Sequence, residues 1–530
     1  TGGNGKGLFK YAPSSGFLAI CSANLADPAI GPGQDNQADD FFGTALYSGS
    51  DFNDLHVGTG GANRPIDTVS IANSLTFVRA DEHELAKDFA TSAGGPGAGN
   101  RRKWTFSTWI KRTRLSPSGN DHYIFGTRTG AADSTFMFLV FRLNDIVVTG
   151  QSTLWLRTDR TFKSTADWFH LVWVLDSDNS TNAEKMRLYI DGIELTSFSS
   201  DSRSSLSGDQ PINAAVEHNI GRHPSSTGYG LDACLADTIF VDGQAYGPEQ
   251  FGQVGSNGDW IPKTYSGTYG TTGFKLTYEN SSYPGYDYQT SDRSGTTNDF
   301  TPAVIASHDV KIDTPTQNFN ILNHETGGTA YDLLTEGGLQ VTGGSGADIG
   351  GVASSLFMPA GVGKWYFEVL IKNPNNGDNY PYVGLAAYER LADNSTYGTK
   401  TRELSINLGK NATFSTNTTY VGTVNSTTTG VVKLENNDVL GVAVDMVNKK
   451  MWFSDNGTFF NSGDPANGTN RQLQWTNDID LYPVFASYNN WGNDSIFNFG
   501  QDASFAGNKT APTTAKTDAN GFGNFLYDVP

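Results

Sequence analysis

The sequence has few of the features that mark disulfide-rich, zinc-binding or membrane proteins. It contains only two cysteines, Cys21 and Cys234, which lie in different segments of the 530-residue chain. This excludes a disulfide framework and leaves too few thiolates for a cysteine-based zinc site. No run of 18 apolar residues occurs, and the longest apolar stretches are as short as residues 136–141. We therefore predict no transmembrane span and no membrane insertion.

Basic residues are also scarce. The chain has 36 Lys and Arg against 55 Asp and Glu, which gives a formal net charge of −19 at pH 7. Nucleic acids are bound mainly through Lys and Arg, and their phosphates are repelled by an acidic surface. We therefore expect no nucleic-acid partner.

Helical periodicity is nearly absent. The best candidate, residues 82–88, would form only one or two turns. Glycine is abundant, with 61 residues, and occurs together with Asn, Asp, Ser and Thr, which favour turns. Aromatic residues make up 12% of the chain, and so many rings need a packed core. Short apolar runs separated by turn clusters predict an all-β fold.

The strand patterns fall into two blocks, residues 66–252 and residues 318–500. In the first block, residues 104–110 alternate, so that Trp104 and Phe106 share one face of a strand while Trp109 belongs to the other. Further strands are expected at residues 169–175, 186–190, 236–243, 364–371, 439–445 and 450–454. Tight hairpin turns are predicted at Asp191–Gly192 and Asn456–Gly457.

These blocks divide the chain into five parts. They are an extended N-terminal junction segment (1–65), a first sandwich (66–252), a connector rich in Gly, Ser, Thr and Tyr (253–317), a second sandwich (318–500) and a C-terminal junction segment (501–530). The predicted fold is all-β, with two tandem antiparallel β-sandwich, jelly-roll-like domains and extended β-rich flanking segments.

The two ends of the chain carry similar sequences. Residues Asn4–Tyr11 match residues Asn520–Tyr527 at Asn, Gly, Gly, Phe and Tyr. Short glycine-rich matches also arise by chance. If the repeat is real, the chain is either one unit cut from a longer tandem array or a unit whose ends meet equivalent surfaces.

The first block resembles a known family. Residues 103–112, 168–173, 188–192 and 235–244 look like the strand sequences of a concanavalin A-like, LamG-type domain. The resemblance covers about residues 70–252. It implies a fold that hosts both lectins and glucanases, so the fold alone does not decide between binding and catalysis.

The second block resembles a SPRY domain. Residues 363–369, 383–385, 438–442 and 481–485 appear in the order of that family. The resemblance covers about residues 320–500 and is the more specific of the two.

The combination also resembles virion structural proteins of tailed phages, particularly marine ones. Residues 7–30 and the stretch from Asn498 to Gln501 carry the junction-like sequences. The resemblance implies a tail-fibre or capsid-surface component located on the virion. Its partners would be copies of itself, in a symmetric homo-oligomer, and other virion proteins.

Catalytic motifs are missing. A retaining glucanase needs two carboxylates about 5 Å apart on one strand face. The Glu-x-Asp-x-x-Glu arrangement that supplies them is absent, and the nearest acidic alternation is Asn477–Asp480. No Gly-x-Ser-x-Gly elbow occurs. We expect a protein that is not an enzyme, and we interpret His170, inside an apolar strand, as a packed residue.

No metal site can be assigned from the sequence. The acidic turn Asp81–Glu84 lacks a second His at helical spacing, so a solvated turn is favoured. The turn after Asp176 begins like a calcium loop, but its sixth position is Thr181 and its twelfth is Arg187. A hairpin turn is favoured there. No cofactor is predicted, although the LamG resemblance allows calcium bound by loop carboxylates and carbonyls.

Aromatic side chains are the remaining candidates for ligand binding. The residues Tyr380 and Tyr382, and the residues Tyr488 and Trp491, lie near expected strand ends of the second block, where loops carry function. Exposed rings there could stack on the apolar faces of sugars. Packing against the connector or a partner subunit is the favoured alternative.

The leading hypothesis is a virion structural and attachment protein that assembles through its β domains, with binding of host-surface carbohydrate as an added function. The alternatives are a secreted, lectin-like glycan-binding module outside any virion and, with little support, a glycoside hydrolase.

Overall fold

The structure is a computed structural model of the chain. It describes residues 18–19, 21–22, 69–115, 121–128, 136–150, 153–224, 228–255, 258–289, 297–323, 334–342, 349–372, 382–387, 404–408, 414–416, 418–427, 434–488 and 494–530. These residues form two compact units. Unit 1 contains the described residues before 25 and from 317 to 530, and unit 2 contains those from 69 to 316.

Two eight-stranded sheets make up most of unit 2. We name them the β5 sheet and the β7 sheet after their central strands. The β5 sheet has the order β12 (Ile193–Glu194), β11 (Met186–Ile190), β10 (Phe169–Asp176), β5 (Lys103–Arg112), β15 (Ala233–Asp242), β3 (Ser74–Phe77) and β20 (Val310–Lys311), with β18 (Phe274–Leu276) also paired to β15. The β7 sheet has the order β13 (Phe198–Asp201), β9 (Thr153–Thr161), β8 (Asp145–Gly150), β7 (Phe136–Arg142), β6 (His122–Arg128), β14 (Glu217–Ile220), β4 (Glu84–Asp88) and β19 (Thr301–Ala303).

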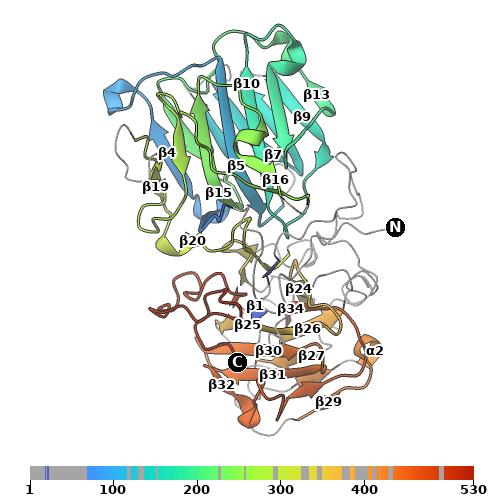
Figure 1. The fold of residues 1–530 in the computed structure, drawn as a ribbon. Coiled ribbons are helices and arrows are strands. Elements are labelled where there is room, and N and C mark those ends of the chain that lie inside the picture. Colours follow the sequence, from blue (N-terminus) through green and yellow to red (C-terminus); the bar gives the residue numbers. More distant parts are fainter. Residues whose placement is uncertain are drawn as a thin grey trace. The chain divides into compact units, whose positions relative to one another are not determined.

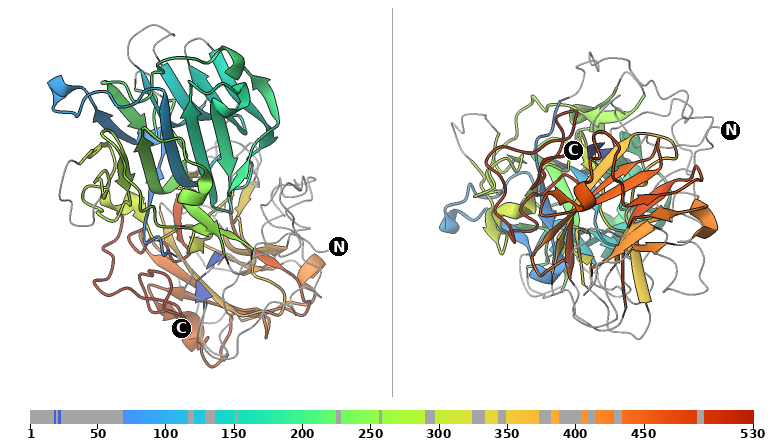
Figure 2. Two further views of the ribbon diagram at one scale, coloured as in Figure 1. Left: turned by 45° about the horizontal axis from the view of Figure 1, so that its top comes forward. Right: turned by 90° about the horizontal axis from the view of Figure 1, so that it is seen from below.

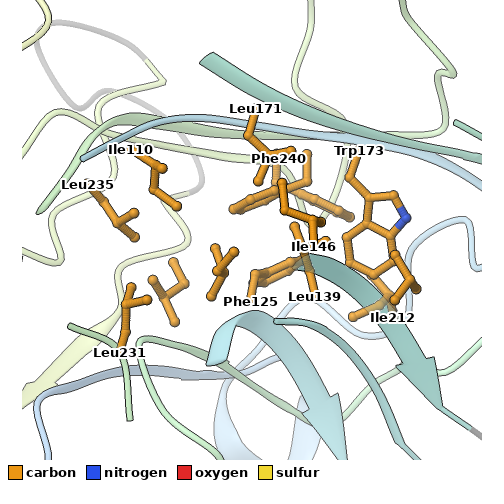
Figure 3. Packing of buried hydrophobic residues seen from close by; sticks show 14 of the residues in the cluster. Ile110, Phe125, Leu139, Ile146, Leu171, Trp173, Ile212, Leu231, Leu235 and Phe240 are labelled. Atoms are coloured by element: carbon orange, nitrogen blue, oxygen red, sulfur yellow. The ribbon is translucent and has the colours of Figure 1, made fainter. Parts of the chain in front are cut away.

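The main core of unit 2 lies between these sheets, whose strands lie face to face in Figures 1 and 2. Figure 3 shows Leu171 and Trp173 of the β5 sheet opposite Leu139 and Ile146 of the β7 sheet. The alternation predicted for residues 104–110 is confirmed, because Trp104 and Phe106 lie in this core while Trp109 packs in a separate cluster on the opposite face. Burial of such side chains from water is the main force that holds the sandwich together.

The outer face of the β5 sheet is also apolar. Val172 and Val241 on this face pack with Phe251, Tyr265 and Tyr269 from the chain that follows β15. That chain carries β16 (Gly252–Val254) and β17 (Trp260–Pro262), which form a two-stranded sheet of their own. The strands of the β5 sheet are therefore apolar on both sides because a further layer covers them.

The segment expected as a connector, residues 253–317, supplies strands to unit 2. In this segment β18 pairs with β15, β19 pairs with β4 and β20 pairs with β3. The clustering places residues up to Thr316 with unit 2.

The helix considered for residues 82–88 is not formed. Glu84–Asp88 is strand β4, in which Leu85 is buried in the core and both neighbours are only half-buried. The strand pairs on one side with β14 and on the other with β19. Tertiary pairing overrides the helical propensity of Glu, Leu, Ala and Lys here.

Unit 1 contains a larger sheet, named the β25 sheet, and a smaller one, named the β34 sheet. The β25 sheet has the order β22 (Leu334–Thr335), β23 (Gln340–Val341), β35 (Ser495–Asn498), β25 (Lys364–Ile371), β30 (Val439–Asp445), β31 (Lys450–Asp455), β33 (Leu473–Gln474) and β29 (Asn425–Ser426), with β32 (Thr458–Phe459) paired to β31. The β34 sheet has the order β24 (Ile349–Ala353), β34 (Leu481–Tyr488), β26 (Tyr382–Ala387), β27 (Leu404–Asn407) and β28 (Phe414–Thr416). Phe485 of β34 contacts Phe497 of β35, with ring centroids 6.4 Å apart, so the inner faces of the two sheets meet.

The N-terminal part of the chain contributes to the same unit. Strand β1 (Leu18–Ala19), blue in Figure 1, pairs in parallel with β25 at Trp365 and Tyr366. It continues the edge along which β35 pairs with Glu368–Ile371. Strand β2 (Cys21–Ser22) pairs with β21 (Asn318–Phe319). Unit 1 is therefore built from segments at both ends of the sequence.

Helices are minor in the described residues. They comprise the short helix α2 (Thr418–Val421) and the 3-10 turns η3 (Arg79–Asp81), η4 (Thr91–Ala93), η6 (Asn182–Glu184), η7 (Arg203–Ser205), η8 (Pro248–Gln250), η9 (Ser307–Asp309) and η13 (Phe460–Ser462). Among the described residues, no helix is long and apolar enough to cross a membrane. The prediction of an all-β fold built from antiparallel sandwiches is confirmed.

Both predicted hairpin turns are formed. Asp191 and Gly192 have φ angles of 49° and 81° between β11 and β12. Asn456 and Gly457 have φ angles of 47° and 81° between β31 and β32. Two successive positive φ angles define the turn whose twist fits a two-residue hairpin.

Candidate functional site

The four aromatic residues nominated from the sequence are only partly described by the structure. Tyr380 and Trp491 lie outside the described residues. Tyr382 is the first residue of β26 and is half-buried, and Tyr488 is the last residue of β34. Tyr382 pairs with Ala486, so positions 382 and 488 are diagonal neighbours on adjacent strands of the β34 sheet. For Tyr488 the structure describes only the backbone.

The acidic residues weighed for catalysis have structural partners. Asp478 is mostly exposed and forms an ion pair with Lys449 at 2.8 Å. Asp480 accepts a hydrogen bond from the backbone N–H of Ala360 at 2.7 Å.

The two turns weighed for metal binding also have other partners. Asp176, the last residue of β10, lies 3.1 Å from Lys103, and Asp178 in the following turn lies 3.3 Å from Arg102. In the acidic turn before β4, Glu82 lies 3.0 Å from Arg222. These ion pairs neutralise carboxylates that a cation would otherwise need.

His170 is the middle member of a hydrogen-bonded chain that contains a serine–histidine pair. Its Nε2 lies 2.8 Å from Ser107 Oγ, and its Nδ1 accepts the indole N–H of Trp260 at 2.9 Å. Burial lowers the pKa of His170 to about 3, so the ring is neutral at physiological pH. Since Nδ1 accepts a hydrogen bond, the single ring proton is on Nε2 and points at Ser107. The imidazole therefore cannot take the proton of Ser107, and the group is structural.

A cluster of aromatic side chains lies on the outer face of the β7 sheet, the face turned away from the main core. Tyr123 of β6 and Phe136 of β7 are half-buried, while Phe138 of β7 is buried between them. His223 and Tyr229 come from the loop after β14. We call these five residues the outer-face cluster.

The rings of the cluster are in mutual contact. Tyr123 meets Phe138, His223 and Tyr229 edge to face, with ring centroids 4.9, 5.0 and 6.0 Å apart. Phe138 lies 5.1 Å from His223. Edge-to-face contacts are the preferred geometry of aromatic pairs and stabilise one arrangement of the rings.

One glycine makes room for the central ring. Gly126 of β6 lies opposite Phe138 in the strand register, and a Cβ at this position would collide with the ring of Phe138. The ring therefore lies directly over the backbone of β6. This places the cluster on two central strands of the sheet, where side-chain positions are more rigid than on loops.

Paired charges lie beside the rings. The guanidinium of Arg142 is bidentate to Asp121, with distances of 3.1 and 2.7 Å to one carboxylate oxygen. At the start of β8, Asp145 pairs with Arg157 of β9 at 2.7 Å. Such pairs offer both donors and acceptors at fixed positions, which is what a polyhydroxylated ligand needs beside an apolar ring face.

The electrostatics of the cluster keep its rings neutral. Burial, followed by the charge of Asp121, raises the pKa of Tyr123 well above its usual value. Burial, followed by Arg128 and Arg222, lowers the pKa of His223 below its usual value. At neutral pH the Tyr123 hydroxyl is therefore protonated and the His223 imidazole is uncharged, so both can donate and accept hydrogen bonds.

One feature of the sequence indicates that this outer face is apolar. Residues 136–141 form an unbroken apolar run, and a strand with such a run is apolar on both faces. The partners His223 and Tyr229 are distant in sequence, and only the pairing of β14 with β6 brings their loop to Tyr123.

The two antiparallel sandwiches define the chain as a protein of two β-sandwich modules. Residues 88–250 match the family model of the concanavalin A-like lectin/glucanases superfamily, and residues 364–502 match the SPRY domain. A concanavalin A-like domain and a SPRY domain are thus both present, as the resemblances indicated. A search of curated proteins found no match.

Three solved structures with similarity each cover less than half of this chain. The SPRY domain of human HERC1 is 16% identical, with 33% of this chain and 96% of that chain covered and a TM-score of 0.24. A proposed carbohydrate-binding protein of Bacteroides ovatus is 14% identical over 44% of this chain and 60% of that one, with a TM-score of 0.29. A heptameric SAP-like pentraxin from Limulus polyphemus is 16% identical over 34% and 82%, with a TM-score of 0.26.

Proposed function

We propose that the chain is a carbohydrate-binding protein and that the outer-face cluster of unit 2 is its binding site. The observation that supports this proposal most strongly is a group of half-buried rings beside an ion pair. The rings are those of Tyr123, His223 and Tyr229, and the bidentate ion pair is formed by Asp121 and Arg142. A sugar has apolar C–H faces that stack on rings and hydroxyls that bond to charged groups. The match of residues 88–250 to a superfamily that contains lectins agrees with this function.

The proposed activity is binding without catalysis. Among the described residues, the carboxylates considered for hydrolysis are held by Lys449 and by the backbone of Ala360. The Ser107–His170 pair has its proton on the wrong nitrogen for nucleophile activation. Release of reducing sugar from β-glucans by the purified chain would contradict this part of the proposal.

A glycan array with the full chain tests the proposal. We expect selective binding of one class of glycans and a loss of about tenfold in affinity, about 1.4 kcal/mol, when Tyr229 is replaced by alanine. The matched control is Tyr283→Ala, since Tyr283 is also a half-buried tyrosine of unit 2 but lies on the loop between β18 and β19. Equal affinity of the two variants would remove the outer-face cluster as the site.

We also propose that the chain acts on a virion surface, as a tail-fibre or capsid-surface component that assembles with copies of itself and other virion proteins. The supporting observations are the phage-like sequences at residues 7–30 and 498–501, the matching ends of the chain and the net charge of −19. Particles purified from the source should contain the chain when their proteins are identified by mass spectrometry. Its absence from intact particles would leave the secreted lectin-like module as the better description.

A further inference from the structure

The last part of the chain, dark red in Figures 1 and 2, crosses the outer face of the β25 sheet. We name residues Asn520–Tyr527 the docked segment. It lies beyond residues 364–502, which match the SPRY domain. The sheet face is therefore covered by a peptide that is not part of the matched domain.

Glu368 of β25 is the anchor of the docked segment. Its carboxylate accepts hydrogen bonds from the backbone N–H groups of Leu526 at 2.9 Å and Tyr527 at 2.8 Å. The Nδ2 of Asn498 at 3.3 Å and the hydroxyl of Tyr366 at 3.2 Å donate to the same group. A buried acidic side chain on a sheet face thus captures two successive backbone amides, which any peptide sequence offers.

Two side chains of the docked segment make specific contacts. Phe525 is fully buried, and its ring meets the ring of Tyr366 at 5.3 Å. Tyr527 donates its hydroxyl to the side chain of Asn456 at 3.2 Å. Its ring lies against Gly457, where an added Cβ would come within 2.7 Å of the ring. A segment that binds here therefore needs Phe and Tyr two residues apart.

The docked segment also needs glycine at two positions. Gly521 and Gly523 have φ angles of 80° and 90°, which other residues rarely adopt. At Gly523 a Cβ would also come within 2.8 Å of the Phe525 ring. The pattern Gly-x-Gly-x-Phe-x-Tyr is therefore what this conformation requires.

The remaining positions are bound through their backbone. The N–H of Asn524 donates to the carbonyl of Gly500, and its side-chain oxygen has no partner among the described residues. Leu526 donates its backbone N–H to the carboxylate of Glu368. Asn520 is exposed and also bonds through its N–H. The hydrogen bonds that Asn520, Asn524 and Leu526 donate therefore come from their backbone N–H groups and do not depend on the side chain.

The N-terminal sequence Asn4–Tyr11 keeps the required residues. Gly5 and Gly7 correspond to Gly521 and Gly523, Phe9 corresponds to Phe525 and Tyr11 corresponds to Tyr527. The sequences differ at Lys6, Leu8 and Lys10, which correspond to Phe522, Asn524 and Leu526. Asn4 also matches Asn520, which is exposed and bonds through its N–H. The other four identities fall on the positions where the docked conformation depends on the residue type, which argues against coincidence.

We propose that the Glu368 face of unit 1 is a recognition site for the sequence Gly-x-Gly-x-Phe-x-Tyr, and that the segment Asn4–Tyr11 of a second copy is its other ligand. A chain whose own docked segment leaves the site can then bind the N-terminal segment of a neighbour. This exchange links copies head to tail and generates a ring or a filament.

A labelled synthetic peptide of residues 1–14 tests the site, with fluorescence polarisation as the readout. The tethered docked segment competes at a high effective concentration, so wild-type chain should bind the peptide weakly. Replacing Tyr527 by Ala weakens that competitor, and we expect binding to tighten by about tenfold. Tyr527→Phe, which removes only the hydroxyl, provides a milder variant should the alanine variant unfold.

Matched peptides and a self-association measurement decide the outcome. The peptide with Lys10→Ala should bind like the original, whereas Phe9→Ala with Tyr11→Ala should abolish binding. Equal binding of all three peptides, or none to a folded Tyr527 variant, would overturn the proposed site. The Tyr527→Ala chain should also self-associate in sedimentation, and changing Phe9 and Tyr11 to alanine in that chain should suppress this. Peptide binding without such association would overturn the role of the second copy.

Discussion

Glu368 combines nearly complete burial with a carboxylate that holds the docked segment. Burial raises its pKa to about 7, while the hydrogen bonds from Leu526, Tyr527, Asn498 and Tyr366 act in the opposite direction. Because the pKa in the folded state exceeds the usual glutamate value of 4.5, the folded state binds more protons between these two pH values. The contribution of Glu368 to stability is therefore full below pH 4.5 and is lost as the pH rises through about 7.

We expect this loss to appear as a pH-dependent difference between two chains. The measured quantity is the difference in the free energy of unfolding of unit 1 between wild type and Glu368→Gln. We expect this difference, wild type minus variant, to fall by about 3 kcal/mol between about pH 5 and about pH 8. The glutamine stays neutral throughout, so groups common to both chains cancel in the difference. Chemical denaturation at a series of pH values measures it. Parallel pH profiles for the two chains would mean that Glu368 is not titrating as described.

A buried ion pair in unit 2 provides a second prediction at the scale of single residues. Lys111 Nζ lies 2.8 Å from Asp313 Oδ2, and both side chains are almost fully buried. Trp168 donates its indole N–H to the other carboxylate oxygen at 3.0 Å. Asp313→Leu removes the carboxylate that faces this buried ammonium, and we expect a loss of about 3–5 kcal/mol in the free energy of unfolding.

The matched control replaces both charges. Lys111→Met with Asp313→Leu should recover most of that loss, because a buried pair can be exchanged for apolar residues at little cost in stability. The hydrogen bond from Trp168 to Asp313 is lost in both variants, so the difference between them reports the effect of the Lys111 charge. A double variant no more stable than the single one would show that shape, rather than charge, determines the loss.

At the scale of elements, the hairpin at Asp191–Gly192 depends on glycine for two reasons. Gly192 has a φ of 81°, and a Cβ there would come within 2.6 Å of the Trp260 ring. Gly243 has nearly the same φ, 82°, but no atom lies within 4 Å of an added Cβ. A comparison of substitutions at Gly192 and Gly243 therefore distinguishes the cost of backbone strain, which both positions share, from the cost of close packing, which only Gly192 has.

Alanine at each position should therefore destabilise unit 2 to a different extent. We expect about 1–2 kcal/mol for Gly243→Ala, from the left-handed conformation alone. Gly192→Ala should lose a further 1–3 kcal/mol or so, because the Trp260 ring must move. Thermal or chemical unfolding of both variants provides the measurement. Equal losses would show that Trp260 adjusts freely.

Elements with strong local patterns could be predicted from the sequence. The strand at 104–110 follows from its alternation, and the two hairpin turns follow from Asp-Gly and Asn-Gly. The strand at Glu84–Asp88 could not be predicted, because it is fixed by pairing with β14 and β19 rather than by its own residues. The strands contributed by residues 253–317 were hidden for the same reason, since each is short and relies on a distant partner.

At the scale of the whole molecule, the two family resemblances could be read from ordered motifs, but the candidate site could not. The outer-face cluster joins residues from β6, β7 and the loop after β14, which meet only once the β7 sheet has formed. The candidates nominated from the sequence were aromatic residues near strand ends, such as Tyr382 and Tyr488, for which packing was the favoured alternative. Sheet topology brings together rings that are distant in sequence, so their positions in the sequence do not reveal the cluster.

The central claim is that carbohydrate binds to the outer-face cluster of unit 2. Hydrogen exchange of the full chain, with and without the strongest glycan from the array, tests it directly, because a bound ligand slows exchange of the amides it stabilises. The account predicts added protection at residues 122–128, 136–142 and 221–231. Protection confined to residues 382–387 and 481–488 would contradict it and would place the site on the β34 sheet instead.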